Sequence, residues 1–217
     1  MSIKEPELGE IEVDDVIQGS AEWRQAKLGI PSASNFARVM AGGRGGEPSV
    51  TRADYLDDLA GEAISGEAAE DFKSAAMERG NVMEPEMRSQ YAFLYDVAPQ
   101  PAGFFRRRFG KWWIGASPDS LVGEDEVVEY KSMIPRLLLR LMENPRVPPE
   151  HMPQCQGTLL VTGRQVCNLT IGYRGMRPVR FRVRRDPSYQ ARLLVGLHTF
   201  LEELDQRVEW ARKWRQE

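Results

Sequence analysis

Residues 117–131, SPDSLVGEDEVVEYK, decide the fold of this chain because they place charged residues around a predicted hairpin. Side chains two positions apart on a strand share one face, so Glu129 and Lys131 point the same way. An acid and a lysine side by side on a central strand are costly to bury without a function. Asp119 stands in the turn before the Leu121-Val122 segment, where the hairpin can return it beside Glu129. The stretch therefore predicts two carboxylates and an ammonium group in one place.

This grouping is typical of metal-assisted phosphodiester hydrolysis. Two carboxylates, from Asp119 and Glu129, bind Mg²⁺, and the carbonyl of Tyr130 can add a third oxygen, with Mn²⁺ as a substitute metal. The ammonium of Lys131 can orient or help deprotonate a water molecule, or neutralise charge on a phosphoryl group. A short motif is weak by itself, and the alternative is a salt bridge at a strand edge with an unrelated aspartate in the turn.

The composition is that of a globular protein with one sizeable core, and we expect a single domain over residues 1–217. No apolar run is long enough to cross a membrane, and the acidic N-terminus lacks an apolar segment, so we expect no signal peptide and a cytoplasmic location.

Two cysteines, Cys155 and Cys167, are too few for a disulfide framework, a four-thiolate zinc site or a four-cysteine iron–sulfur cluster. With only two histidines as well, a catalytic metal would be a hard cation held by carboxylates.

Charge is segregated along the chain although the net charge is only −3. Residues 1–15 hold six acids and one lysine, which suggests an acidic N-terminal tail. Residues 174–185 hold six arginines, and Arg106, Arg107, Arg108 and Lys111 form a second basic cluster. Each cluster alone could be a solvated strand face, but two in an acidic protein favour a phosphate-rich partner.

Hydrophobic periodicity predicts an α/β domain with a central mixed β-sheet flanked by helices. A glycine-rich loop over 42–46 separates two short helices from two longer ones, and strands begin at Phe104. The expected helices are Ala21–Leu28, Ser32–Met40, Thr51–Ala63, Phe72–Tyr95, Ile134–Met142, Glu150–Val161 and a long C-terminal helix, Ser188–Arg215. The expected strands are Phe104–Arg108, Trp112–Ala116, Glu126–Ser132, Gln165–Tyr173 and Pro178–Arg184.

The motif has the form PD-(D/E)xK, and the segments around it resemble one branch of that nuclease superfamily, the lambda exonuclease family of YqaJ-like phage recombination exonucleases. Order and spacing agree from about Gln18 to Gly163. Besides the motif itself, the resemblance is carried by Gln18-Gly19-Ser20, Trp23-Arg24, Leu28-Gly29-Ile30, Ser32-Ala33-Ser34, the pair Gly80 and Glu84, and Gln154-Cys155-Gln156.

The resemblance implies a role for each matching residue of the catalytic centre. Asp119, Glu129 and the Tyr130 carbonyl match metal ligands, and Lys131 matches the catalytic lysine. Glu84 matches a helix glutamate that supports a metal or its water, with Glu86 as the alternative if the helix rotates at Pro85. Gln154 matches a helix glutamine that braces the site, with Gln156 as its alternative.

The resemblance also implies contacts with DNA. Ser34 and Ser117 match positions that hold a 5′-terminal phosphate, and Lys27 stands where an arginine is common, which replaces a bidentate grip by a point charge. Arg24, one helical turn earlier, could compensate. Arg44 matches a residue that reaches into the DNA groove, and Met77 one that helps split terminal base pairs. The alternatives are an ordinary loop arginine and an ordinary buried methionine.

By resemblance, the expected activity is that of a Mg²⁺-dependent 5′→3′ exonuclease on double-stranded DNA. It would release 5′-mononucleotides, leave a 3′ overhang, form a ring-shaped homotrimer and work with a single-strand annealing protein. One alternative is a structure-specific or restriction-type endonuclease of the same superfamily, for which Ser34 and Ser117 would be dispensable. The other is a non-catalytic DNA-binding scaffold, against which the complete acid–acid–lysine set argues.

Overall fold

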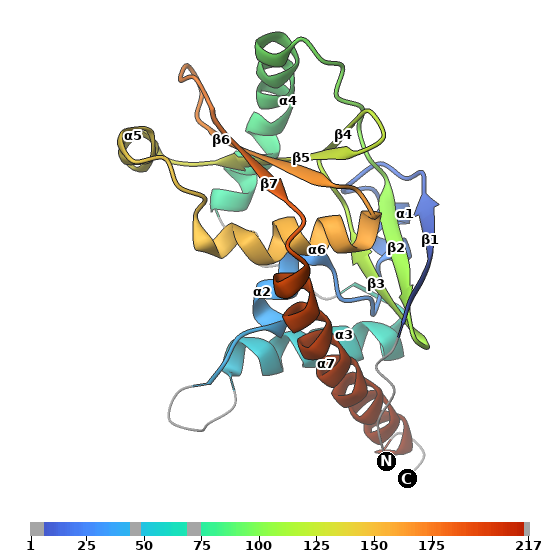
Figure 1. The fold of residues 1–217 in the computed structure, drawn as a ribbon. Helices are drawn as coiled ribbons and strands as arrows, with labels where there is room; N and C mark the ends of the chain where they lie inside the picture. The colour runs from blue at the N-terminus through green and yellow to red at the C-terminus, as the bar shows by residue number, and fades with distance from the viewer. Residues whose placement is uncertain (1–6, 44–48, 69–74, 215–217) are drawn as a thin grey trace.

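The computed structural model describes residues 7–43, 49–68 and 75–214, without the side chains of 75–79 and 81 (Figure 1). Groups of helices and groups of strands follow one another along the chain, as expected for a mixed α/β fold, and the described residues include two 3₁₀ turns, Ala33–Asn35 and Pro149–His151. The helices are α1 (Ala21–Ala26), α2 (Phe36–Val39), α3 (Val50–Ser65), α4 (Ala75–Tyr95), α5 (Pro135–Glu143), α6 (Met152–Thr162) and α7 (Pro187–Trp214). The strands are β1 (Leu8–Asp14), β2 (Phe104–Phe109), β3 (Trp112–Ala116), β4 (Ser120–Val122), β5 (Glu126–Ser132), β6 (Val166–Gly172) and β7 (Val179–Arg184).

The strands form two sheets in the described part of the chain, where one central sheet was expected. β1, β2 and β3 make an antiparallel sheet, and the second sheet has the order β4-β5-β6-β7. In the second sheet β5 and β6 are parallel while the outer pairs are antiparallel, so this sheet is mixed. The predicted fold class, a mixed α/β core flanked by helices, is therefore confirmed, with the correction that the sheet is divided.

The acidic N-terminal segment is not a free tail, which corrects the expectation for residues 8–14. These residues form β1 and pair antiparallel with β2, so that Glu12 lies opposite Arg106. Nη2 of Arg106 lies 2.6 Å from Oε2 of Glu12, and Nε of Arg108 lies 3.5 Å from Oε1 of Glu10. Acidic and basic strands attract each other across the ladder, which the local charge run could not reveal. Part of the second basic cluster is thus engaged within the protein.

Helix α6 contributes to two of the hydrophobic cores and positions the site. Its residues from Cys155 to Thr162 are buried, and they contribute to the core beneath the β1–β3 sheet and to the core under β5–β7. A Cβ at Gly157 would lie only 2.3 Å from Cδ2 of Phe36, so this glycine is what allows α6 to approach α2. The expected helix over Ser32–Met40 is here a 3₁₀ turn followed by the single turn of α2.

The two faces of the β4–β7 sheet are covered by different helices, as Figure 1 shows for α4 above and α6 below β5. Val128 and Tyr130 of β5 pack against Met83, Met87 and Tyr91 of α4. Val127 packs with the α6 side, so by strand alternation Glu129 faces α6 as well. Two arginines of the basic segment 174–185 contact α4 from its side of the sheet: Arg180 over the ring of Tyr95 and Arg174 paired with Glu86.

Candidate active site

The β4–β5 hairpin brings Asp119 to Glu129, as the motif predicted. Ser120 pairs with Val128 in the antiparallel register, which places the preceding Asp119 beside the middle of β5. The backbone N–H of Tyr130 donates to Oδ2 of Asp119 over 2.6 Å. This bond fixes the aspartate against the strand that carries the glutamate and the lysine, so the arrangement results from local hairpin geometry.

Glu129 is 1% exposed and is surrounded by donors. Nε2 of Gln154 donates to Oε2 over 2.6 Å, and Oγ1 of Thr158 donates to Oε1 over 3.1 Å. Nζ of Lys131 lies 3.8 Å from Oε2. Gln154 and Thr158 are four residues apart on α6 and therefore present one face of that helix to β5. These contacts satisfy a carboxylate that would otherwise be costly to bury.

The electrostatics of the cluster depend on burial and on mutual repulsion. Burial, followed by the negative charge of Asp119, raises the pKa of Glu129 well above its usual range. Burial also raises the pKa of Asp119, against the opposing effect of Lys131. For Lys131, burial acts to lower the pKa, but Glu129 and Asp119 outweigh it and the pKa is raised. The lysine is therefore an ammonium ion, and a further cation would relieve the repulsion between the carboxylates.

Glu84 joins this cluster from α4, and Glu86 does not. The pKa of Glu84 is raised by burial and then by Asp119, which shows that the two carboxylates interact. Arg88 donates from Nη2 to Oε1 of Glu84 over 2.6 Å and to the carbonyl of Asp119 over 2.9 Å. Glu86 instead pairs with Arg174 at 3.2 Å. Of the two glutamates considered from sequence, only Glu84 faces the motif.

The side chain of Gln154 faces the cluster, whereas the side chain of Gln156 forms its hydrogen bonds with other segments. Nε2 of Gln156 donates to the carbonyl of Arg184 over 2.8 Å, and its Oε1 accepts from the backbone N–H of Asp186 over 3.0 Å. Gln190 donates to the carbonyl of Gln156 over 3.2 Å. Gln156 thus joins α6 to the end of β7 and the start of α7, away from Glu129.

A cavity of about 150 Å³ joins the predicted phosphate-binding residues to the motif. Lys27, Ser34 and Ser117 line it together with Asp119 and Lys131, while Arg24 is absent from its lining. The full lining is Gln18, Trp23, Lys27, Ser32, Ala33, Ser34, Phe104, Ser117, Asp119, Lys131, Gln154 and Thr158. The cavity therefore combines hydroxyls and the ammonium groups of two lysines with the carboxylate of Asp119.

Four residues of this region were not assigned a role from sequence: Trp23, Ser32, Arg88 and Thr158. Nε1 of Trp23 donates to Oγ of Ser117 over 2.8 Å, and the hydroxyls of Ser32 and Ser34 lie 3.3 Å apart. The spacing of Arg88 from Glu84 and of Thr158 from Gln154, four residues in each case, was a usable signal. Arg44 and the side chain of Met77 lie outside the described residues, so their predicted roles stay predictions.

The donor set of the cluster fits a hard divalent cation. Asp119 and Glu129 supply carboxylate oxygens and Tyr130 a carbonyl, which are the ligand types that Mg²⁺ prefers. A carboxylate accepts about four hydrogen bonds or ligands, so the three donors around Glu129 leave it room for a metal. Within the described ranges, no three acidic, histidine or cysteine side chains form a metal site by themselves. A cation here would therefore keep water or substrate oxygens, as Mg²⁺ commonly does.

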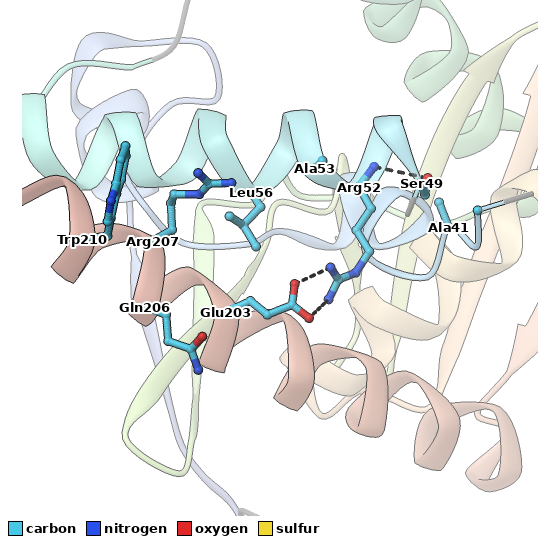
Figure 2. A pocket seen from close by; sticks show the side chains of 10 residues that line it. Ala41, Ser49, Arg52, Ala53, Leu56, Glu203, Gln206, Arg207 and Trp210 are labelled. Atoms are coloured by element: carbon cyan, nitrogen blue, oxygen red, sulfur yellow. Dashed lines mark hydrogen bonds and ion pairs between the residues drawn. The ribbon is translucent and has the colours of Figure 1, made fainter. Parts of the chain in front are cut away.

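A larger cavity, of about 610 Å³, lies between α3 and α7, away from the motif (Figure 2). Its charged side chains are paired with one another or with neighbours. The guanidinium of Arg52 binds both carboxylate oxygens of Glu203, and Nε of Arg207 lies 3.0 Å from Oδ1 of Asp57. Among the predicted site residues that the structure describes, none lines this cavity, so we place the chemistry in the smaller cavity.

Comparisons with known proteins give the family and the structural relatives of this chain. The sequence model of the YqaJ-like viral recombinase domain matches residues 22–165. The crystal structure of the alkaline exonuclease LHK-Exo from Laribacter hongkongensis is similar to this chain, with a TM-score of 0.78 and 26% identity over 90% of this chain and 98% of that one. Its complex with dAMP gives a TM-score of 0.80 at the same identity and coverage.

A phage-related exonuclease from Haemophilus somnus 129PT has the same fold, with a TM-score of 0.63 and 10% identity over 84% of this chain and 96% of that one. No curated protein matches the sequence significantly. Among helices in the described part of the chain, none is both long and apolar enough to cross a membrane. The family match covers more than half of the sequence and includes the hairpin, Glu84 and Gln154. The chain belongs to the YqaJ-like viral recombinase domain family.

Proposed function

We propose that this protein is a Mg²⁺-dependent 5′→3′ exonuclease that degrades one strand of linear double-stranded DNA, releases 5′-mononucleotides and leaves 3′ overhangs. The observation that carries the proposal is the shared cavity in which Lys27, Ser34 and Ser117 lie with Asp119 and Lys131. A nuclease that cuts at internal positions needs the carboxylates and the lysine but has no use for an anion pocket beside them. The pocket therefore favours an enzyme that starts from a phosphorylated end.

The comparisons support the enzyme class. The chain belongs to a recombination nuclease family, and its structural relative LHK-Exo is an alkaline exonuclease with a known complex with dAMP. A deoxynucleoside monophosphate such as dAMP is the kind of product that stepwise hydrolysis from a 5′ end would release here. The same cavity offers hydroxyl and ammonium groups suited to a phosphate oxygen.

Each residue of the cluster would have its own role in the reaction. Asp119, Glu129 and the Tyr130 carbonyl would hold Mg²⁺, with Glu84 supporting the metal or its water. When bound, the metal would polarise the scissile phosphate and activate water. The raised pKa of Lys131 keeps its ammonium charged, so it serves by stabilising negative charge and orienting the nucleophile. Gln154 and Thr158 hold Glu129 in position through their hydrogen bonds.

The end pocket would define the length of each step. A phosphate held by Lys27, Ser34 and Ser117 fixes the distance from the chain terminus to the carboxylates, so one nucleotide is removed at a time. Arg24 does not line the cavity, which makes Lys27 the main cation of the proposed grip. The proposal extends to a ring-shaped homotrimer around the DNA and to an annealing protein that receives the 3′ strand, in the cytoplasm of a bacterial host.

The test is a time course on blunt linear duplex DNA with Mg²⁺, comparing 5′-phosphorylated, 5′-hydroxyl and covalently closed circular substrates. Lys131→Ala controls for contaminating nucleases. We expect mononucleotides from phosphorylated ends, few from hydroxyl ends and none from circles. Nicking of the circle would instead favour the endonuclease, and the roles of Lys27, Ser34 and Ser117 would fall with the exonuclease. Binding without any metal-dependent cleavage would favour the scaffold.

A further inference from the structure

Trp23 of α1 makes three contacts that connect its helix to the cavity. Its backbone N–H donates to Oγ of Ser20 over 3.1 Å, which caps the helix. Its indole Nε1 donates to Oγ of Ser117 over 2.8 Å, across 94 residues of sequence. Nζ of Lys27, one helical turn later, lies 4.2 Å from the centre of its ring. One side chain thus touches two of the three residues predicted to hold a 5′ phosphate.

The bond to Ser117 fixes the direction in which that hydroxyl can act. An indole N–H only donates, so the oxygen of Ser117 must be the acceptor. The proton of the Ser117 hydroxyl is then left for another partner, and Ser117 lines the cavity. Trp23 therefore presents Ser117 to the cavity as a hydrogen-bond donor, which is the polarity that a phosphate oxygen requires.

The contact with Lys27 restrains a flexible cation. A lysine has a long stem with many rotamers and offers a point charge rather than a planar fork. An ammonium over an indole face is attracted by the negative face of the ring. This contact holds the Lys27 ammonium on the wall of the cavity and offsets part of what is lost by the absence of an arginine.

We propose that Trp23 is a positioning residue for recognition of the 5′ end: it orients the Ser117 hydroxyl and holds the Lys27 ammonium toward a terminal phosphate. The inference rests on the proposed exonuclease function and adds a residue to its end pocket. A tryptophan that only fills space would stabilise the fold without changing the preference between phosphorylated and hydroxyl ends. A tryptophan that positions Ser117 and Lys27, by contrast, increases the preference for phosphorylated ends.

The decisive variant is Trp23→Phe, which keeps an aromatic face for Lys27 and removes the indole N–H. We expect the ratio of initial rates on 5′-phosphorylated and 5′-hydroxyl duplexes to fall about three- to tenfold, the usual effect of losing one hydrogen-bond partner. Both rates are measured on the same preparation, so the ratio does not depend on the amount of active protein in it.

Two further variants separate positioning from general damage. Trp112→Phe removes another indole N–H, which donates to Asp205 over 2.9 Å. Neither residue lines the cavity, so this variant should leave the ratio unchanged. In the Ser117→Ala background, Trp23→Phe should lower the ratio by a much smaller factor than in the wild type, because the bond it removes no longer exists. A ratio unaffected by Trp23→Phe, or the full additional loss in the Ser117→Ala background, would overturn the inference.

A third substitution keeps the test decisive if Trp23→Phe does not fold. The benzothienyl isostere of tryptophan, introduced at position 23 alone, preserves the ring shape and replaces the N–H by sulfur. It should give the same fall in the ratio, and an unchanged ratio again contradicts the inference. If the wild-type protein itself shows no preference for phosphorylated ends, the proposed end pocket fails rather than the role of Trp23 within it.

Discussion

The guanidinium of Arg88 lies 2.6 Å from the carboxylate of Glu84, one turn away on α4. The same group donates to the carbonyl of Asp119 and, through Nε, to Oγ of Ser120 over 2.9 Å. One arginine therefore joins the helix that carries Glu84 to the hairpin that carries Asp119 and Glu129. In the proposed reaction it would act through these residues, and the sequence motif does not include it.

Arg88→Lys should weaken the metal site while leaving the fold intact. A lysine cannot reproduce the fork that reaches three partners, so Glu84 and the hairpin lose their common anchor. We expect the Mg²⁺ concentration for half-maximal cleavage to rise about tenfold or more, the usual cost of removing an outer partner of a metal ligand. Calorimetric titration with Ca²⁺ measures the same loss without turnover. Arg174→Lys, which alters the pair with Glu86 on the same helix, is the matched control and should change neither value.

Thr158→Val should destabilise the protein through Glu129. The substitution keeps the shape of a side chain that is 1% exposed and removes its hydrogen bond to a buried carboxylate. We expect a loss of about 1.5–3 kcal/mol in the free energy of unfolding, measured with urea at pH 8. Thr162→Val on the same helix removes a hydrogen bond to a neutral carbonyl and should cost less. Equal losses of unfolding free energy in the two variants would argue that the bond from Thr158 to Glu129 is no stronger than a bond to a neutral carbonyl.

The raised pKa of Glu129 predicts how stability changes with pH in the absence of metal. Burial and the charge of Asp119 make the folded state bind this proton more tightly than the unfolded state does. The free energy of unfolding in EDTA should therefore fall as the pH rises from the ordinary carboxyl range through the raised pKa of the folded protein. Glu129→Gln should flatten this fall, and Mg²⁺ should stabilise the wild type more than the variant at pH 8. A slope in Glu129→Gln as steep as that of the wild type would contradict the prediction.

Gly157→Ala should damage the packing on which the site rests. The new Cβ would lie 2.3 Å from the ring of Phe36, so α6 and α2 must move apart. We expect a loss of about 1–3 kcal/mol in unfolding free energy and a lower rate of cleavage. Gly61→Ala in α3, where nothing lies within 4 Å, should instead stabilise the protein by about 0.5–1 kcal/mol. Both predictions are checked by measuring the unfolding free energy of the two variants with denaturant.

The sequence predicted the parts of the site that depend on local geometry. Strand alternation and the hairpin placed Asp119 beside Glu129, and the structure has the two joined through the Tyr130 N–H. The family resemblance, rather than any local pattern, indicated Gln154, and the structure has its amide donating to Glu129. The hairpin relationship depends on residues close in sequence with a clear period, which is the information that a single sequence contains.

The rest depends on contacts between distant segments. The N-terminal acids resembled a solvated tail because their partners, Arg106 and Arg108, lie about a hundred residues away. The bond between Trp23 and Ser117 joins a short helix to the turn before the motif, and no local pattern predicts it. The division of the strands into two sheets likewise depends on distant contacts, because α6 packs against both sheets and no local pattern indicates which strands pair.

The most direct test of the central claim is the order in which labels leave a linear duplex during digestion. One strand carries a label in its 5′-terminal phosphate or in its 3′-terminal nucleotide, and the wild type is compared with Lys131→Ala. The account predicts that the 5′ label appears at once as a mononucleotide, while the 3′ label stays in a shortening strand until late in the reaction. Early release of the 3′ label, or early release of the 5′ label on oligonucleotides instead of mononucleotides, would contradict a 5′→3′ exonuclease that removes one nucleotide at a time.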